Sequence, residues 1–314
     1  MRIGIDAMGG DFAPEAIVLG VKLAFDKLPF STKLVLIGDE KEIISIMRRE
    51  SIDPSGFEIV HASEVIEMGE HPAKIFSKKS DSSISVGFKL LSSGQIDGFA
   101  SAGSTGAILV GTMYSIQLIS GIIRPCITAP LPKEDGKTAI LLDVGINPDC
   151  KPDNLYQYAI LGSIYAENVY NIKKPKVGLL NIGSEPEKGN LLTKATHDLM
   201  KSTKDFNFIG NIEGNDLFKE DSADVIVCDG FTGNIVLKGA EAVYSLIKRR
   251  KITDEFFDRF NPDIYGGTPV LGINSTVIIG HGASNPKAIK NMILHTKEVI
   301  EAELSKKIKE ALKQ

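Results

Sequence analysis

The sequence predicts an α/β fold in which helices cover both faces of a mostly parallel sheet. Short apolar runs alternate with segments of helical periodicity from one end of the chain to the other, a pattern typical of βαβ units. Several runs are apolar at almost every position, as strands buried on both faces should be; they are AILL, VGLL, DVIV and TVII. A loop of small residues follows each run, and ligands of such sheets bind where these loops gather.

The first predicted units share one order of strand, loop and helix. Their strands are expected at 2–6, 33–38 and 96–100, and their helices at 16–25, 39–50 and 108–119. Each strand is short and rich in β-forming apolar residues, and each helix has apolar residues at helical spacing. The stretch from Phe99 to Ile123 carries no charge. Its serines and glycines make it too polar for a membrane span, so we expect a buried helix after a loop.

The later units repeat this order. Their strands are expected at 138–145, 176–183, 223–229 and 275–280, and their helices at 154–169, 191–200 and 235–247. One final helix is predicted from about Lys287 to Lys313. Its apolar face repeats every 3.6 residues and consists of Ile289, Met292, Ile293, Thr296, Val299, Ile300 and Leu304. Its other face mixes lysine with glutamate, which favours a packing helix over one lying on a membrane.

Length, charge and cysteine content narrow the class of protein. The 314 residues fit one large domain or two intertwined ones, and no proline-rich linker divides them. The net charge of −4 argues against a non-specific nucleic-acid binder. Three separated cysteines without a CxxC pair indicate reduced thiols in a reducing compartment. We expect Cys126, Cys150 and Cys228 to be buried. The first residues lack the apolar stretch that is typical of a signal peptide.

Glycine-rich loops are the main candidates for a binding site. SAGSTGA at 101–107 and GFTGN at 230–234 pair hydroxyls with glycine, and SEPEKGN at 184–190 adds a lysine. Glycine lets the main chain approach a ligand closely, and free N–H groups at the start of the next helix attract an anion. Several such loops at one sheet edge would form an anion pocket. A tight turn explains each loop taken alone, so both interpretations stay open.

The signatures of other chemistries are missing from the sequence. No GxGxxG opens the first unit, no GxxxxGK[ST] occurs, and Ala102 stands where GxSxG needs its first glycine. The histidines are His61, His71, His197, His281 and His295. They lack metal-ligand spacing, so no zinc site is expected. Asp6 and Asp11 flank a glycine turn, where hydrogen bonding to the turn is favoured over cation binding.

A set of longer motifs extends nearly from end to end of the chain. They are IGIDAMGGDFAPE, KKSDSSISV, SAGSTGA, LLDVGIN, LLNIGSEPEKGN, NFIGNIEGNDLF, DVIVCDGFTGNIVLK, YGGTPVLG and HGASN. Together they resemble the PlsX family, the phosphate acyltransferases of bacterial phospholipid synthesis. The resemblance implies a three-layer fold like that of isocitrate dehydrogenase and phosphotransacetylase. It implies one unit over 1–314 with two intertwined subdomains and a cleft between them.

The resemblance also implies an activity and partners. Acyl-(acyl carrier protein) and inorganic phosphate would give acyl phosphate and free carrier protein, feeding phosphatidic acid synthesis in lipid metabolism. The implied protein is a cytoplasmic homodimer that needs no cofactor. It contacts the inner face of the membrane peripherally and supplies a membrane glycerol-3-phosphate acyltransferase. Two alternatives stay open: an acyl-CoA-dependent phosphotransacylase of the phosphotransacetylase type, and a non-catalytic binding protein.

This reaction needs an anion site and an oxyanion site more than a protein nucleophile. Phosphate is already nucleophilic, so the enzyme has to hold it beside a thioester carbonyl and stabilise the developing oxyanion. With the family motif as support, we expect Lys188 to hold phosphate or the oxyanion and Asn234 to donate to the carbonyl oxygen. The alternatives are a solvent-exposed lysine at a helix start and an ordinary helix cap.

Further substrate or phosphate contacts follow from the resemblance. They are Asp6, Gly9, Gly10, Asp11, Lys79, Ser82, Ser83, Ser104, Thr105, Gly106, Asn147, Gly189, Asn190, Asp229, Thr232, Gly233 and His281. Asp229 is expected to orient its loop, and His281 is as consistent with a structural role as with donation to the substrate.

The chain departs from the family pattern in a few places. Ser77, Ser104 and Ser184 stand where arginine, asparagine and an acid are usual, which changes fine contacts and leaves the reaction class unchanged. The segment from Lys248 to Gly267, tied to dimerisation and membrane contact in relatives, is shorter than usual. Its cluster of Lys248, Arg249, Arg250 and Lys251 fits either docking of an acidic carrier protein or a solvated helix end.

Overall fold

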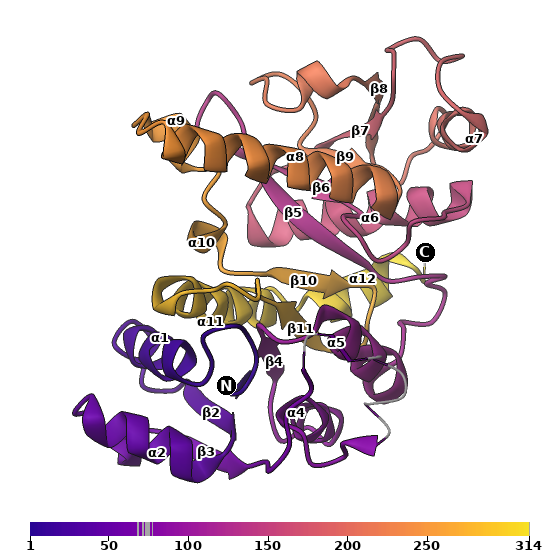
Figure 1. Cartoon of the computed structure of the whole chain (residues 1–314). Helices are drawn as coiled ribbons and strands as arrows, with labels where there is room; N and C mark the ends of the chain where they lie inside the picture. Colours follow the sequence, from indigo (N-terminus) through magenta and orange to yellow (C-terminus); the bar gives the residue numbers. More distant parts are fainter. Residues whose placement is uncertain (68, 71, 73–75, 77, 314) are drawn as a thin grey trace. The chain divides into compact units, whose positions relative to one another are not determined.

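The computed structural model describes residues 1–313 apart from 68, 71, 73–75 and 77. The described chain forms two units, and each draws on separate stretches of sequence. Met1–Leu118 and Pro262–Ser305 form the first unit, and Ile119–Asn261 with the residues from Lys306 onward form the second. Figure 1 shows this interleaving by colour, since yellow residues before Lys306 lie beside the indigo start of the chain.

The first unit contains a sheet of strand order β3-β2-β1-β4-β11-β10. Its strands are β1 (Arg2–Asp6), β2 (Lys33–Gly38), β3 (Glu58–His61), β4 (Gly98–Ser101), β10 (Thr268–Leu271) and β11 (Thr276–Ile279). Neighbouring strands are parallel except for β10, which pairs antiparallel with β11. The mostly parallel sheet expected from the apolar runs is confirmed.

Helices surround this sheet and cover both of its faces. They are α1 (Glu15–Phe25), α2 (Glu40–Arg49), η1 (Pro54–Gly56), α4 (Ser83–Ser92), α5 (Thr105–Gly111), η2 (Thr112–Ile116), α10 (Pro262–Tyr265) and α11 (Pro286–Glu301). Gly98 of β4 faces Ile300 of α11, whereas the next residue, Phe99, packs on Gly87 of α4. Since successive strand residues point to opposite faces, α11 and α4 lie on opposite faces of the sheet.

The second unit contains a sheet of strand order β5-β6-β9-β7-β8. Its strands are β5 (Cys126–Pro132), β6 (Thr138–Leu142), β7 (Lys176–Leu180), β8 (Asn207–Ile212) and β9 (Val225–Val227). The β5–β6 pair is an antiparallel hairpin, and the other pairs are parallel. The parallel strands therefore place the loops after β6, β7 and β9 at one edge of this sheet.

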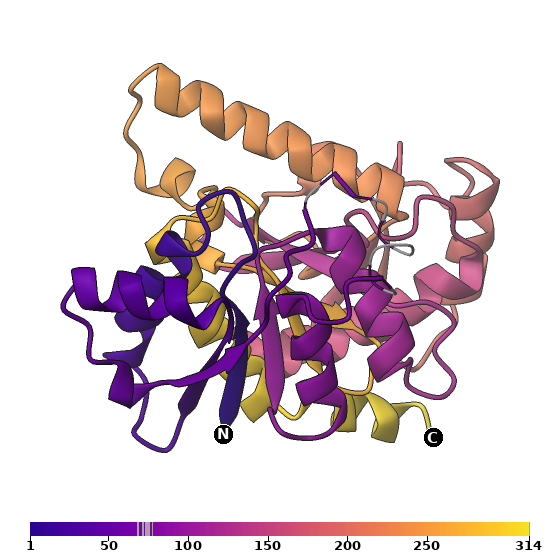
Figure 2. The same ribbon diagram turned by 60° about the horizontal axis from the view of Figure 1, so that its bottom comes forward.

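The helices of the second unit include one with very few buried residues. They are α6 (Pro152–Val169), α7 (Leu191–Met200), η3 (Gly214–Asp216), α8 (Gly230–Arg249) and α9 (Glu255–Asp258), and α12 (Leu304–Ala311) follows α11 at the end of the chain. Gly162 lets α6 approach Val225 of β9 closely. In α8 only Gly230 and Gly233 are buried, and Figure 2 shows the length of this helix.

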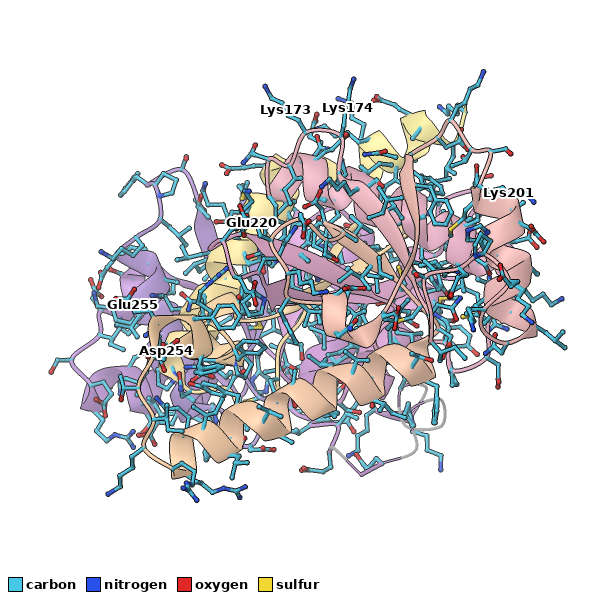
Figure 3. The ribbon with its side chains drawn as sticks, turned by 90° about the horizontal axis from the view of Figure 1, so that it is seen from above. Lys173, Lys174, Lys201, Glu220, Asp254 and Glu255 are labelled. Atoms are coloured by element: carbon cyan, nitrogen blue, oxygen red, sulfur yellow. The ribbon has the colours of Figure 1, made fainter. Side chains whose placement is uncertain are left out.

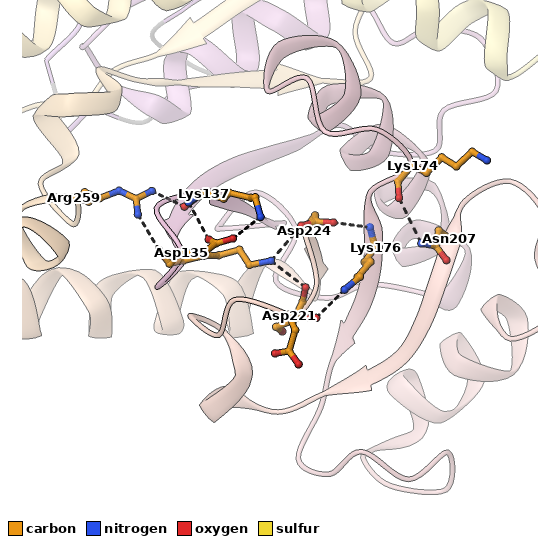
Figure 4. Close-up of polar contacts among 10 residues, drawn as sticks. Asp135, Lys137, Lys174, Lys176, Asn207, Asp221, Asp224 and Arg259 are labelled. Carbon is orange, nitrogen blue, oxygen red and sulfur yellow. Dashed lines mark hydrogen bonds and ion pairs between the residues drawn. The ribbon is translucent and has the colours of Figure 1, made fainter.

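A polar network lies at the edge of the second sheet where β6, β7 and β9 begin (Figure 4). This edge is opposite to the one that carries the loops after these strands. The buried ammonium of Lys133 donates to Asp224 at 3.3 Å and to the carbonyl of Ser222 at 3.1 Å. The guanidinium of Arg259 donates to the carbonyls of Lys133 and Lys137 on the β5–β6 hairpin. This contact fixes the segment after α8 to the hairpin.

The prediction of one continuous final helix is wrong, because the structure has two helices there. α11 ends at Glu301, Glu303 adopts a positive φ of 49°, and α12 begins at Leu304. Neither glycine nor proline marks the break, so the apolar period runs through it. The residues after Ser305 pack in the second unit, with Ile308 buried, and packing therefore overrides the local helical pattern.

Two other expectations about helices also need correction. GFTGN was expected as a loop, but α8 already begins at Gly230 with Asp229 as its N-cap. The helix expected over 108–119 ends as a regular α-helix at Gly111 and continues as a π-helical turn to Ile116. Within the described ranges, we find no helix with the length and apolar character needed to cross a bilayer.

Candidate active site

Lys188 lies in the connection 181–190 between β7 and α7, in the second unit. Its side chain is exposed, and its ammonium makes no hydrogen bond or ion pair with any described residue. Gly189 adopts a φ of +96°, and Asn190 caps α7 by accepting from the N–H of Thr193 at 2.9 Å. The lysine therefore stands two residues before a helix N-terminus, where main-chain N–H groups and the helix dipole favour an anion.

A hollow of about 230 Å³ lies beside this loop. Its lining residues are Leu155, Leu180, Asn181, Ile182, Gly189, Asn190, Thr193, Cys228, Asp229 and Thr232. Four predicted contacts, Gly189, Asn190, Asp229 and Thr232, thus lie around one space. Leu155, Leu180 and Cys228 give it an apolar side, so the hollow combines apolar and hydrogen-bonding surface.

Asp229 fixes the start of α8, as expected. Its carboxylate accepts from both the N–H and the hydroxyl of Thr232, each at 2.8 Å. Thr232 is thereby oriented at the wall of the hollow. The aspartate therefore acts as a helix cap that shapes the site.

Asn234 lies in the second turn of α8, so the helix-cap alternative for this residue is wrong. Its side-chain N–H donates to the carbonyl of Val144 at 3.2 Å. A side-chain amide has two N–H donors, so one remains for a substrate oxygen. Gly145, at a φ of +141°, leaves room for this amide, because a Cβ there would lie 3.2 Å from Asn234 Nδ2.

The loop after β6 is organised by Asp143, which sequence reasoning did not single out. Its buried carboxylate accepts from the N–H groups of Ile127, Ile146 and Asn147, and burial raises its pKa. Asn147 uses both side-chain N–H groups on Asp143 and the carbonyl of Pro125. Asn147 therefore keeps no free N–H for a substrate.

Gly230 and Gly233 bring α8 against this same loop. The N–H of Gly230 donates to the carbonyl of Asn147 at 2.8 Å. A Cβ on Gly233 would lie 1.9 Å from the carbonyl oxygen of Asp143. A side chain at Gly233 would therefore displace α8 from the loop after β6.

Asp6 organises the corresponding loops of the first unit. Its fully buried carboxylate accepts from the hydroxyl of Ser101 at 2.6 Å and from the N–H of Met8 at 3.0 Å, and burial raises its pKa. A Cβ on Gly9 would lie 2.3 Å from this carboxylate and 2.7 Å from the N–H of Gly103. The expected bonding of Asp6 to the glycine turn is confirmed.

Asp11 does not share this role. Its carboxylate is exposed and accepts no hydrogen bond within the described part of the chain, so the expectation that it holds the turn is wrong. Its main-chain N–H donates to the carbonyl of Gly282 at 2.8 Å, and Gly10 before it has a φ of +111°. The turn after β1 is thus joined to the loop after β11, next to His281.

Several other predicted contacts are already engaged within the protein. The ammonium of Lys79 donates to Glu70 at 2.8 Å and to the carbonyl of Val65 at 2.7 Å, and this contact lowers the pKa of Glu70. Ser82 caps α4, and Ser83 hydrogen-bonds to Asp6. These residues hold the framework of the first unit.

The remaining predicted residues of the first unit differ in accessibility. Ser104 is buried and caps α5, whereas Thr105 is exposed and free to contact a ligand. Gly106 allows close approach to Pro72, since a Cβ would lie 2.5 Å from Pro72 Cγ. His281 is exposed, and its Nδ1 accepts from the N–H of Ala283 at 3.2 Å. This local bond supports a structural role for the ring.

The expectation that all cysteines are buried is wrong for one of them. Cys126 and Cys228 are buried, but Cys150 is half-exposed. It lies in the loop after β6, where its thiol contacts the carbonyl of Asn147 at 3.4 Å. Ser77 and His71 lie outside the described residues.

The chain belongs to the fatty acid synthesis protein family, whose model matches residues 1–307. It is 43% identical to the phosphate acyltransferase of Dictyoglomus turgidum, over 99% of this chain and 98% of that protein. It is 44% identical to that of Desulfitobacterium hafniense, with the same coverage. The Aquifex aeolicus phosphate acyltransferase is 42% identical, over 98% and 96%. The resemblance to PlsX proteins is confirmed, and the chain is an enzyme of the acyltransferase class.

Solved structures agree on the fold. A phosphotransacetylase from Streptococcus pyogenes superposes with a TM-score of 0.66 at 17% identity, over 95% of this chain and 94% of that one. A branched-chain phosphotransacylase from Enterococcus faecalis gives a TM-score of 0.62 at 14% identity, over 96% and 99%. The expected phosphotransacetylase-like α/β fold is confirmed.

Proposed function

We propose that this chain transfers the acyl group of an acyl carrier protein thioester to inorganic phosphate. A phosphate oxygen attacks the thioester carbonyl carbon, the C–O bond forms, and the C–S bond breaks. The products are acyl phosphate and the free thiol of the carrier, whose sulfur takes up the proton that the hydrogen phosphate loses. The observation that carries the proposal is the ammonium of Lys188, which has no partner among the described residues. It precedes the N-terminus of α7 in a loop whose Gly189 and Asn190 line a partly apolar hollow.

Each step has a candidate group in the second unit. Lys188 and the first N–H groups of α7 attract the phosphate dianion and hold it for attack. The remaining N–H of Asn234 donates to the carbonyl oxygen, where negative charge develops. The carboxylate of Asp229 is engaged with Thr232 and does not serve as a general base. Phosphate is already a nucleophile, so the proposal needs no protein base.

An acyl substrate fits the surroundings of Lys188. Ile182 and Leu191, on either side of the lysine in sequence, are 82% and 89% exposed. Large aliphatic side chains in water are expected where an apolar ligand or partner binds. We propose that they contact the acyl chain next to its thioester.

The test is incubation of the enzyme with inorganic phosphate and matched palmitoyl thioesters of acyl carrier protein and coenzyme A. Acyl phosphate formed mainly from the carrier thioester supports the proposal. Preference for the coenzyme A thioester would make the enzyme a phosphotransacylase of the phosphotransacetylase type. Absence of thioester-dependent acyl phosphate with both donors contradicts both. Shorter acyl chains in the same assay test the contact with Ile182 and Leu191.

The end of α8 is the proposed docking site for the acidic carrier. Arg249, Arg250 and Lys251 are exposed, whereas Lys248 pairs with Asp258 at 3.3 Å. Changing these three residues to glutamate should raise the carrier-thioester KM at low salt and leave the coenzyme A donor unaffected. Lys173 and Lys174, which point outward in Figure 3, provide the matched control for charge reversal. An unchanged carrier KM across salt concentrations argues against docking at this site.

α8 also supports a homodimer in this proposal. Phe231, Ile235, Val243 and Leu246 are exposed along it, at 51–62% of their surface. Their spacing forms one helical stripe, which a second copy of the chain would cover. Light scattering of Val243→Glu and Leu246→Glu should show a monomer; an unchanged mass contradicts this interface.

The proposed product combines an acyl chain with a phosphate. It therefore suits delivery to a membrane glycerol-3-phosphate acyltransferase, and we include peripheral membrane contact in the proposal. Co-sedimentation with anionic lipid vesicles tests this contact, and a protein that stays in the supernatant at low salt contradicts it.

A further inference from the structure

The connection that carries Lys188 is fastened at both ends by one side chain. Asn181 directly follows β7, and its main-chain N–H donates to the carbonyl of Ile212 at 2.8 Å. Its side-chain N–H donates to the carbonyl of Lys188 at 3.1 Å, and its Oδ1 accepts from the N–H of Ile182 at 2.9 Å. The Asn181 amide thus ties the beginning of the connection to Lys188 itself.

A second amide holds the same connection from the neighbouring strand. Asn211 lies on β8 and is 7% exposed. Its side-chain N–H donates to the carbonyl of Glu185 at 2.8 Å, and that carbonyl also accepts from the main-chain N–H of Lys188 at 3.1 Å. The carbonyl of Lys188 therefore accepts directly from Asn181. The N–H of Lys188 shares the carbonyl of Glu185 with Asn211.

Two glycines complete the support of the lysine. A Cβ on Gly183 would lie 2.8 Å from Lys188 Cγ, so the aliphatic part of Lys188 lies against that glycine. A Cβ on Gly189 would lie 2.0 Å from the hydroxyl of Thr193 and 2.3 Å from Asn181 Oδ1. The backbone and the stem of Lys188 are thus held, while its ammonium has no partner among the described residues.

This arrangement exceeds what joining a strand to a helix requires. Such connections commonly hold about 2–6 residues, whereas 181–190 is longer, and Glu185 to Lys188 are exposed. Placing a polar asparagine in a buried strand position costs free energy unless its groups are paired, and Oδ1 of Asn211 has no partner in the described structure. Position 211 therefore holds a buried amide that is hydrogen-bonded only through its N–H among the described residues. An apolar residue would pack at this position without that cost.

We propose that Asn181 and Asn211 are positioning residues that fix Lys188 for the acyl transfer. This inference rests on the role proposed above for Lys188. Asn211 acts through the lysine alone. Asn181 also lines the hollow, and its positioning role is carried by its hydrogen bond to the carbonyl of Lys188. Loss of either amide would let the 181–190 connection move and displace the ammonium, and a displacement of about 1 Å is enough to slow a reaction strongly.

The test is a double-mutant cycle with Asn181→Ala, Asn211→Leu and Lys188→Ala, followed by acyl phosphate formation. Each asparagine variant should lower kcat roughly tenfold or more at saturating thioester and change the thioester KM less than about twofold. In the Lys188→Ala background neither asparagine change should lower activity further, because residues that act through one group are not additive. Asn207→Leu is the control, because Asn207 also lies on β8 but bonds the distant carbonyl of Lys174.

The outcomes separate this inference from the proposed function. Full activity of Lys188→Ala overturns the role of the lysine and, with it, the positioning. An inactive Lys188→Ala with fully active Asn181→Ala and Asn211→Leu overturns the positioning alone. Equal additional losses in both backgrounds also overturn it, because they indicate a merely structural effect. Circular dichroism checks folding; if Asn211→Leu does not fold, Asn181→Ala, at a half-exposed position, decides the question.

Discussion

The hydroxyl of Ser101 donates a 2.6 Å hydrogen bond to the carboxylate of Asp6, from a residue 95 positions away in the chain. The two residues end neighbouring strands, since β1 pairs with β4. Both side chains are fully buried. The bond therefore joins the loops after two parallel strands and keeps the glycine turns around them in register.

The buried Asp6 predicts how stability depends on pH. Burial raises its pKa in the folded protein above the ordinary 3.8, so the folded state binds this proton more tightly than the unfolded state. The contribution is greatest at low pH and is lost as the pH rises from about 3.8 through the raised value. Asp6→Asn removes it, so the stability of the natural chain relative to this variant should fall as the pH rises. Urea unfolding of both proteins from pH 4 to 8 measures the difference, and a constant difference contradicts the prediction.

Lys188→Ala should lose most of its turnover and keep its fold. The lysine is exposed and unpaired among the described residues, so its removal leaves no buried group without a partner. Loss of a charge that holds a reacting anion is expected to cost about a hundredfold or more in kcat/KM. Acyl phosphate formation and circular dichroism measure the two effects. The exposed Lys194 on α7 is the control, and normal turnover by a folded Lys188→Ala would falsify the assignment.

Asn234→Ala should lower kcat by about 10²–10³ if the amide stabilises the oxyanion. Asn234→Asp should be no better, because it replaces a donor with a negative charge. Thioester KM should change little, since the interaction strengthens only as charge develops. Steady-state kinetics measure this, with Ser245→Ala, at an exposed position of α8, as the control. A kcat within about threefold of the natural enzyme for Asn234→Ala is incompatible with this role.

Arg259→Ala should destabilise the second unit. The guanidinium is half-buried and donates to two carbonyls of the β5–β6 hairpin. Hydrogen bonds from charged groups contribute roughly 1.5–3 kcal/mol, so a loss of that order in the free energy of unfolding is expected. Arg250→Ala, at an exposed position, should have little effect in the same denaturant titration. Equal stability of the two variants would show that Arg259 does not anchor this segment.

The strands that sequence could predict are those buried on both faces. β6, β7, β9 and β11 appear as apolar runs followed by small residues, because a parallel sheet covered by helices demands such composition. β3, β5, β8 and β10 were not predicted, and β8 and β5 show why. NFIGNI is exposed or half-exposed at its first four positions and buried only at its last two, and CITAPLP contains two prolines, so neither has that composition. Their place in the sheet depends on pairing with distant strands.

The site was predictable in chemistry and less so in detail. Glycine, hydroxyl and lysine residues in the loops could be read directly as an anion site. Which of them remain free depends on partners that only the fold brings together, such as Pro125 beside Asn147 and Glu70 beside Lys79. Asn181 and Asn211 were missed. Asn181 directly follows the apolar run VGLL, and that position is a signal that could have found it. Asn211 lies on β8, which the sequence did not reveal as a strand.

The interleaving of the two units has a consequence for synthesis on the ribosome. Every strand of the second sheet has been translated by Val227, before β10 and β11 of the first sheet exist. The first sheet therefore remains incomplete, because β4 still lacks its neighbour β11, while the strands of the second sheet can already pair. A premature stop after residue 261 would leave α1 without α11, whose Ile289 packs against Gly20. Nonsense and frameshift mutations late in the gene should therefore disrupt the packing of the N-terminal part of the protein, including α1.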